Sequence, residues 1–87
     1  MDMDLKMWND IKETVRKKLN TTQISYDTWI APLDFSIKEN KFFIILPAHM
    51  EMARKFIEIK YGEAFQSTLR EHLGDRFEVK FVVGDYT

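Results

Sequence analysis

The segment LDFSIKENKFFIILP, Leu33–Pro47, decides the fold, because it holds two strand patterns separated by a short turn. Apolar and polar residues alternate strictly in Leu33–Lys38, which is typical of a strand with one buried face. All residues of Phe42–Leu46 are apolar, which favours a covered, central strand. Between the two, Glu39 and Asn40 predict a tight turn, with Asn40 suited to the positive φ that hairpins require. The segment therefore predicts a β-hairpin.

Helical spacing of apolar residues follows the hairpin, from Ala48 to about Leu73. Gly74 is a natural stop for this helix, and alternation in Phe77–Val83 predicts a third strand. The helix is expected to turn these residues to the core: Ala53, Ile57, Tyr61, Ala64, Phe65 and Thr68. A second apolar set, Met52, Phe56 and Ile59, lies roughly opposite on the helical wheel. It indicates either deeper burial or a face offered to a partner.

Two helices are expected before the hairpin. From Asp4 to about Asn20 an apolar stripe predicts an amphipathic helix, with Lys12 and the later charged residues mostly outside that stripe. The stripe consists of Leu5, Trp8, Ile11, Val15 and Leu19. A second, short helix is capped by Ser25 or Asp27 and runs to about Ala31, since the following Pro32 disfavours helical geometry there.

The resulting order is helix, short helix, strand, strand, long helix, strand, which predicts an α+β fold with a three-stranded sheet covered by helices. The uncovered face of the sheet is expected to be wet and to carry Asp34, Ser36, Lys38, Glu78 and Lys80. With 87 residues, 45% of them apolar, the chain predicts one small domain that spans residues 1–87.

Charge and composition exclude several classes of function. Thirteen Lys and Arg stand against fourteen Asp and Glu, with no basic half, so nucleic acid is not expected as a strongly bound partner. No cysteine is present. The acidic start does not resemble a signal peptide, and no apolar run approaches the roughly 20 residues that span a bilayer. A soluble, cytoplasmic protein without a membrane partner is therefore expected.

Residues for catalysis or cofactor binding are not arranged in any recognisable pattern. The only histidines, His49 and His72, lack the carboxylate spacing of a metal site. Ser25 and Thr28 have no histidine or glycine-rich elbow nearby, so helix capping is preferred for them over nucleophilic chemistry. The three glycines form neither a phosphate loop nor the Gly-x-x-Gly clamp of KH domains. We therefore expect no enzyme, no cofactor and no metal.

Five pieces of the chain, taken together, resemble a known family. They are an early helix beginning near Leu5 and Trp8, ISYDTWIAPL (residues 24–33), ILP (45–47), KFIEIKY (55–61) and FEVKFVV (77–83). Their order resembles the N-terminal domain, domain I, of the bacterial replication initiator DnaA over essentially the whole chain. The loop after Pro47 is about two residues longer here than in the family. The chain also ends at Thr87, where the family continues through a linker into ATPase and DNA-binding domains.

The resemblance implies a KH-like fold and a protein-interaction domain that serves helicase recruitment, regulator binding and self-association. It implies partner contacts on the short helix and at the start of the long one, namely Ser25, Tyr26, Thr28, His49, Met50, Glu51 and Met52. For Trp8 two interpretations stay open. Periodicity places it in the core, as for Trp29, whereas the resemblance implies a role in weak self-association. The alternatives are a freestanding regulatory domain that competes for the initiator's partners and a weak KH-like binder of single-stranded nucleic acid.

Overall fold

The predicted hairpin forms one half of a three-stranded sheet in the computed structural model, which describes residues 3–84. The predicted α+β class and the order of helices and strands are confirmed. The elements are the helices α1 (Leu5–Lys18), α2 (Gln23–Ser25) and α3 (Arg54–Leu73), the π-helix η1 (Tyr26–Ile30), the 3-10 helix η2 (Ala48–Ala53), and the strands β1 (Asp34–Lys38), β2 (Lys41–Leu46) and β3 (Glu78–Val83).

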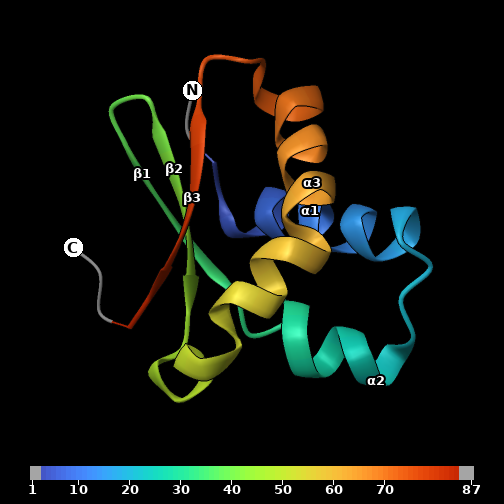
Figure 1. The fold of residues 1–87 in the computed structure, drawn as a ribbon. Coiled ribbons are helices and arrows are strands. Elements are labelled where there is room, and N and C mark those ends of the chain that lie inside the picture. The colour runs from blue at the N-terminus through green and yellow to red at the C-terminus, as the bar shows by residue number, and fades with distance from the viewer. Residues whose placement is uncertain (1–2, 85–87) are drawn as a thin grey trace.

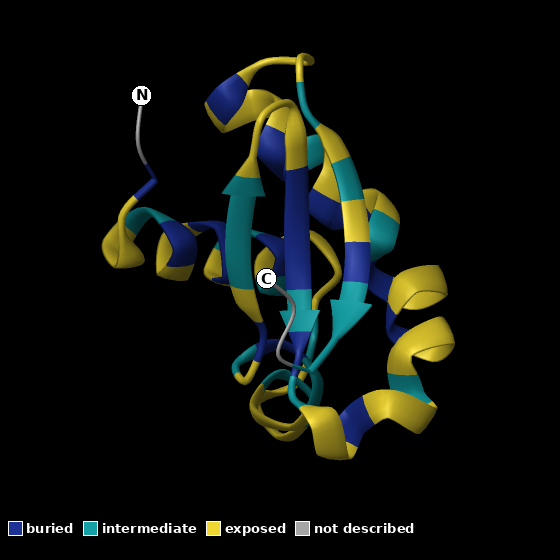
Figure 2. Ribbon diagram, turned by 90° about the vertical axis from the view of Figure 1, so that its left-hand side faces the viewer, coloured by how far each residue is buried: buried dark blue, intermediate teal, exposed yellow. Residues whose placement is uncertain are grey.

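Strand β2 occupies the centre of the sheet, as its continuous apolar sequence predicts. It pairs antiparallel with β1, with Phe35 opposite Ile44, and parallel with β3, with Phe42 opposite Val79. The helices lie on one side of the sheet, and α3 provides the crossover that a parallel pair requires (Figure 1). Residues of β2 that face the helices, such as Phe42 and Leu46, are fully buried. Figure 2 looks onto the uncovered face of the sheet. Lys80 pairs with Phe43 and not with the helix-facing Phe42, so it lies on this face, where it is exposed.

The hairpin turn uses a different residue from the one predicted. Lys38 pairs with Lys41, so the loop contains only Glu39 and Asn40. Glu39 takes the left-handed conformation, with φ of 57°, and Asn40 does not. The assignment to Asn40 was therefore wrong, because this two-residue loop needs positive φ at its first position.

The short helix starts earlier than predicted and widens along its length. Thr22 caps it, with its hydroxyl accepting a hydrogen bond from the backbone N–H of Ser25 at 3.2 Å, so neither Ser25 nor Asp27 is the cap. The helix then continues as the π-helix η1, which the hydrogen bond from Ala31 N–H to the Tyr26 carbonyl closes at 2.8 Å. The next residue is Pro32, which cannot donate a backbone hydrogen bond.

The long helix is divided into two parts. Residues 48–53 form the 3-10 helix η2, which begins with a hydrogen bond from Met50 N–H to the Pro47 carbonyl at 2.9 Å. Regular α-helix starts only at Arg54, so one continuous helix from Ala48 was wrong. The predicted end is confirmed, because Gly74 follows the last turn with φ of 85°, a conformation that favours glycine.

Trp8 joins α1 to the rest of the core. Its indole is 1% exposed and packs against Phe35, Phe42 and Phe65, with ring centroids 5.4, 5.8 and 5.8 Å away. The indole N–H donates a hydrogen bond to the Leu33 carbonyl at 2.9 Å. Periodicity therefore placed Trp8 correctly, and its ring does not lie on the surface that direct self-association requires.

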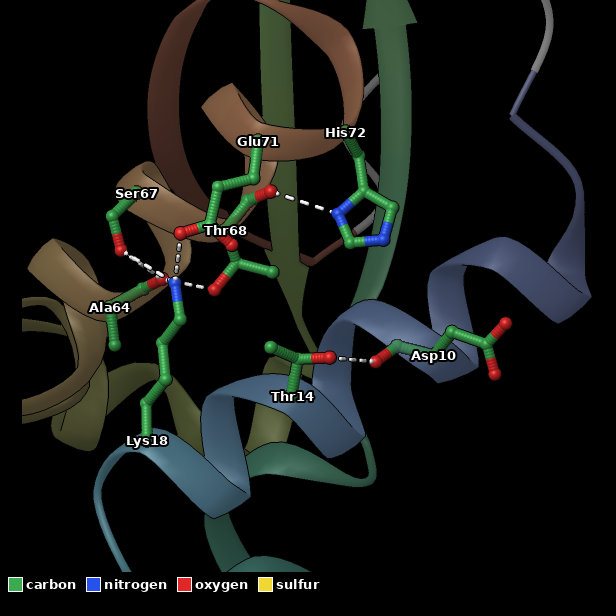
Figure 3. A network of polar contacts seen from close by, with 8 residues as sticks. All are labelled: Asp10, Thr14, Lys18, Ala64, Ser67, Thr68, Glu71 and His72. Carbon is green, nitrogen blue, oxygen red and sulfur yellow. Dashed lines mark hydrogen bonds and ion pairs between the residues drawn. The ribbon is translucent and has the colours of Figure 1, made fainter.

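The ends of the predicted α1 stripe point to solvent instead of the core. Leu5 is 67% exposed and Leu19 is 40% exposed, and neither belongs to the core, which takes Trp8, Ile11 and Val15 from α1. Near the C-terminal end of α1, Lys18 reaches α3 and contacts Ser67 Oγ at 3.1 Å and Glu71 Oε2 at 2.9 Å (Figure 3). Such a partly exposed ion pair contributes little free energy. It nevertheless joins the end of α1 to α3.

Trp8→Ala should lower the free energy of unfolding by about 3–5 kcal/mol, because it removes a buried ring and leaves the Leu33 carbonyl with one donor fewer. Leu5→Ala, on the same helix but exposed, is the matched control and should change stability by no more than about 0.5 kcal/mol. Urea unfolding followed by circular dichroism measures both. Equal, small effects of the two substitutions would contradict the placement of Trp8 in the core.

Candidate protein-interaction surface

Several large apolar side chains remain exposed on the helical side of the molecule. Among residues 3–84 they are Leu5, Leu19, Ile24, Met52, Phe56 and Ile59. Phe56 and Ile59 are three residues apart and lie on one face of α3, and Met52 precedes them in η2. We call these three residues the α3 stripe. Met52 is 97% exposed and Ile59 is 74% exposed. A single exposed apolar residue is normal on a protein surface, but a group of them indicates an interaction site.

The short helix extends the α3 stripe through Trp29. The rings of Trp29 and Phe56 meet edge to face, with centroids 5.3 Å apart. Trp29 is half-buried and packs against the core, so the expectation that it is a core residue holds only in part. Its ring covers part of Phe56 and still presents a surface to solvent. Trp29 and the α3 stripe therefore form one aromatic and aliphatic patch, built from two segments far apart in the sequence.

A groove runs beside this patch, between the end of α1 and the middle of α3. Its larger part has a volume of about 650 Å³, and its smaller part, toward the start of α2, has about 250 Å³. Both parts are lined by Leu19 and Lys60, and we call the whole the Lys60 groove. The larger part is also lined by Glu58, Ile59, Glu63, Ala64 and Ser67, and the smaller part by Asn20, Thr21, Thr22 and Ser25.

A buried lysine holds η1 in place. Lys12 was expected outside the apolar stripe of α1, but it is only 6% exposed. Its ammonium donates hydrogen bonds to the carbonyls of Ala31, at 2.8 Å, and Leu33, at 3.3 Å. Burial lowers the pKa of Lys12, and the nearby Asp34 carboxylate partly opposes this. The lysine thus satisfies the carbonyl of Ala31, the residue that follows η1, and that of Leu33 beyond Pro32, and so it ties the end of the short helix to α1.

The predicted contact residues of the short helix point in different directions. Ser25 is half-buried and lines the Lys60 groove. Thr28 is exposed, and its hydroxyl donates to the Ile24 carbonyl at 2.8 Å. Tyr26 packs toward α1, where the Arg16 guanidinium lies 5.8 Å from its ring. Burial, followed by the nearby Glu13 carboxylate, raises the pKa of Tyr26. The Tyr26 ring therefore does not join the α3 stripe.

The predicted contacts in η2 also divide into two groups. His49, Glu51 and Met52 are exposed, whereas Met50 is 7% exposed and belongs to the apolar core. Met50 therefore lacks the exposure that a direct contact requires, because it is the residue of η2 that is buried in the core. Of the seven predicted contact residues, only Met52 belongs to the patch around Phe56.

Some residues of the surface were not assigned as contacts from the sequence. Phe56 and Ile59 were recognised as a second apolar face, but Trp29 and Leu19 were assigned to the core and Lys60 was not considered. A signal for Lys60 exists, since it follows Phe56 by four residues and so lies next to it on the helix. Its ammonium lies 5.6 Å from the centre of the Phe56 ring.

Within residues 3–84, no group of three or more His, Asp or Glu side chains is placed to hold a metal ion. None of the helices in that range has the length and apolar character of a membrane-spanning helix.

Comparison with known proteins gives one consistent family. The family model described as the DnaA N-terminal domain matches residues 6–71. The chromosomal replication initiator protein DnaA of Lachnoclostridium phytofermentans is 30% identical over an alignment of 79 residues that covers 87% of this chain and 17% of that protein. The DnaA of Francisella philomiragia subsp. philomiragia is 35% identical over 69 residues, 78% of this chain and 13% of that protein. The chain thus spans less than a fifth of the length of these relatives.

The burial of Lys12 predicts a pH-dependent difference in stability between the protein and its Lys12→Met variant. In the folded protein the pKa of Lys12 lies below 10.5. Between that lowered value and 10.5, the unfolded chain still holds a proton that the folded protein has released. The free energy of unfolding of the unsubstituted protein should therefore rise relative to the variant as the pH increases through this window.

Urea unfolding of both proteins from about pH 7 to about pH 10 measures this difference. Burial raises the pKa values of Tyr26 and Tyr61, so these phenols favour the folded state at lower pH and lose that contribution as the pH passes their folded values. Both proteins contain them, so their effect cancels in the difference. A difference that is constant, or that shifts in favour of the variant with rising pH, would contradict the burial of the Lys12 ammonium.

Proposed function

The chain belongs to the family of DnaA N-terminal domains, and we propose that it works in the cytoplasm as a protein-interaction domain in the initiation of DNA replication. The observation that carries the proposal is the exposed α3 stripe beside Trp29. A patch with an aromatic centre and a polar rim has the composition of a modest protein interface. The proposal assigns no catalysis to this domain.

The proposed partners are the replicative helicase and regulators of initiation. This choice rests on the family resemblance, while the surface itself indicates how they would bind. Phe56 is the central anchor, since its ring is supported by Trp29 on one side and approached by Lys60 on the other. Met52 adds a flexible thioether, which adapts to partners of different shape. Both signs of charge surround the patch, with Arg54 and Glu58 paired at 2.8 Å.

Partner binding should depend on Phe56 more than on the uncovered face of the sheet. Phe56→Ala should weaken binding of the helicase by about 1–2 kcal/mol, because it removes an aromatic anchor. Lys80→Ala, on the far side of the sheet, is the control and should leave the affinity unchanged. Calorimetric titration with the replicative helicase of the same organism measures both, after melting curves show that the variants are folded. A loss of affinity in Lys80→Ala alone would place the interface on the sheet.

Weak self-association is proposed through the exposed beginning of α1. Trp8 is buried and supports this segment from behind, while Leu5, three residues earlier on the same helix, is 67% exposed. The contact proposed for a second copy is therefore Leu5 and the surface of the first turn, with Trp8 holding that turn against the sheet. Leu5→Ser should shift the protein toward monomer without lowering its stability.

Sedimentation equilibrium at several protein concentrations measures this shift. Ile24→Ser, which removes an exposed apolar side chain from α2, is the matched control and should keep the association of the unsubstituted protein. If Ile24→Ser abolishes association and Leu5→Ser does not, the contact lies on the short helix and the proposed use of α1 is wrong.

A further inference from the structure

Lys60 stands in its groove as a cation without an acidic partner. Among residues 3–84 it forms no salt bridge, whereas its neighbours Lys18 and Arg54 pair with Glu71 and Glu58. Instead its ammonium lies near two aromatic rings, 5.6 Å from the centre of Phe56 and 5.7 Å from that of Tyr61. These rings restrict the side chain and attract its charge. Lys60 lines both parts of the groove, and its ammonium, which pairs with no carboxylate among residues 3–84, still has donor capacity.

Hydroxyl groups surround the lysine on the side toward α2. Thr21, Thr22 and Ser25 line the smaller part of the groove together with Lys60. The Thr22 hydroxyl accepts the Ser25 N–H, so its own hydrogen remains available for donation. The ammonium can only donate hydrogen bonds, and the hydroxyls can turn their hydrogens toward an acceptor. A group that accepts hydrogen bonds and carries negative charge fits this part of the groove.

The larger part of the groove has a different character. Leu19 and Ile59 contribute apolar surface, and Glu58 and Glu63 contribute carboxylates. Glu58 is already engaged by Arg54, at 2.8 Å. A chain of phosphates would meet these two carboxylates, which disfavours nucleic acid as the occupant. A single carboxylate next to an apolar side chain avoids them and uses both parts of the groove.

We propose that the Lys60 groove is a recognition site for a partner peptide segment that places an aspartate or glutamate carboxylate on Lys60 and an adjacent apolar side chain against Leu19 and Ile59. This inference rests on the proposed function and adds the chemistry of the segment that the domain recognises. The groove adjoins the α3 stripe through Ile59, so one partner can cover both surfaces. The apolar contacts supply most of the affinity, and the ion pair selects the acidic segment.

A pair of blocked peptides that differ only in charge tests the site directly. The isotope-labelled protein is titrated with acetyl-Leu-Glu-Leu-amide and, separately, with acetyl-Leu-Gln-Leu-amide, and backbone amide shifts are followed by NMR. The glutamate peptide should give saturable shifts at Thr21, Thr22, Ser25 and Lys60. It should bind about threefold more tightly than the glutamine peptide, as expected for a partly exposed ion pair.

Two lysine variants separate the site from general electrostatics. Lys60→Gln should reduce the affinity for the glutamate peptide to that for the glutamine peptide. Lys55→Gln removes an exposed lysine from the same helix that does not line the groove, and it should change nothing. Equal binding of the two peptides, the absence of saturable shifts at the groove, or equal losses in both variants would overturn the proposal. Tighter binding of oligothymidylate than of the glutamate peptide at the groove would also overturn it.

The outcome for the groove is independent of the outcome for the domain as a whole. If helicase binding depends on Phe56 and is unaffected by Lys60→Gln, the proposed function stands and the carboxylate site is wrong. If the glutamate peptide occupies the groove and Phe56→Ala leaves helicase binding unchanged, the site exists and the proposed α3 interface fails.

Discussion

The arrangement of this domain depends on the way that α1 satisfies the backbone carbonyls on either side of Pro32. Trp8 and Lys12, one helical turn apart, donate hydrogen bonds to the carbonyls of Ala31 and Leu33 from within the core. At this corner the short helix has ended and the sheet has not yet begun, so the backbone has few partners of its own. Unpaired buried carbonyls would cost free energy. The two side chains remove that cost and hold the C-terminal end of η1 against α1.

The position of η1 in turn creates the exposed patch. With its C-terminal end held by α1, the π-helix places Trp29 against Phe56 of α3 while Tyr26 packs toward Arg16. The core-facing residues of α3 lie toward the sheet, so in the opposite set Phe56 is covered only in part, by Trp29, and Met52 and Ile59 stay exposed. An apolar face therefore stays exposed, and the Lys60 groove lies beside it. Interaction with other proteins follows from this arrangement more directly than catalysis does.

Periodicity and turn chemistry predicted most of the fold from the sequence. The alternation in the first strand, the continuous apolar run of β2 and the stop at Gly74 all correspond to the structure. Errors arose where a contact between distant segments decided the outcome. The sequence pattern places Lys12 outside the apolar stripe of α1. In the structure it is buried, and its ammonium donates hydrogen bonds to carbonyls about twenty residues later in the chain. Leu19 belongs to the apolar stripe by spacing, yet α1 ends at Lys18 and Leu19 is 40% exposed.

The candidate surface was predicted less completely than the fold, for a similar reason. Met50 and Met52 look equivalent in the sequence, but a 3-10 turn directs the first into the core and the second into solvent. Large aromatic residues are usually buried, which predicts a core position for Trp29. In the structure its ring is half-buried and contacts Phe56 on the surface of α3. Burial of single residues in a turn depends on its exact geometry, which composition and spacing do not determine.

Chemical-shift mapping of the isotope-labelled domain with the replicative helicase is the most direct test of the central claim, that the face formed by η1 and α3 receives the partner. The account predicts that the largest shifts fall on Trp29, Met52, Phe56 and Ile59, with little change at Ser36, Lys38 and Lys80 on the uncovered face of the sheet. Shifts confined to the sheet face, with none at Trp29 or Phe56, would contradict it.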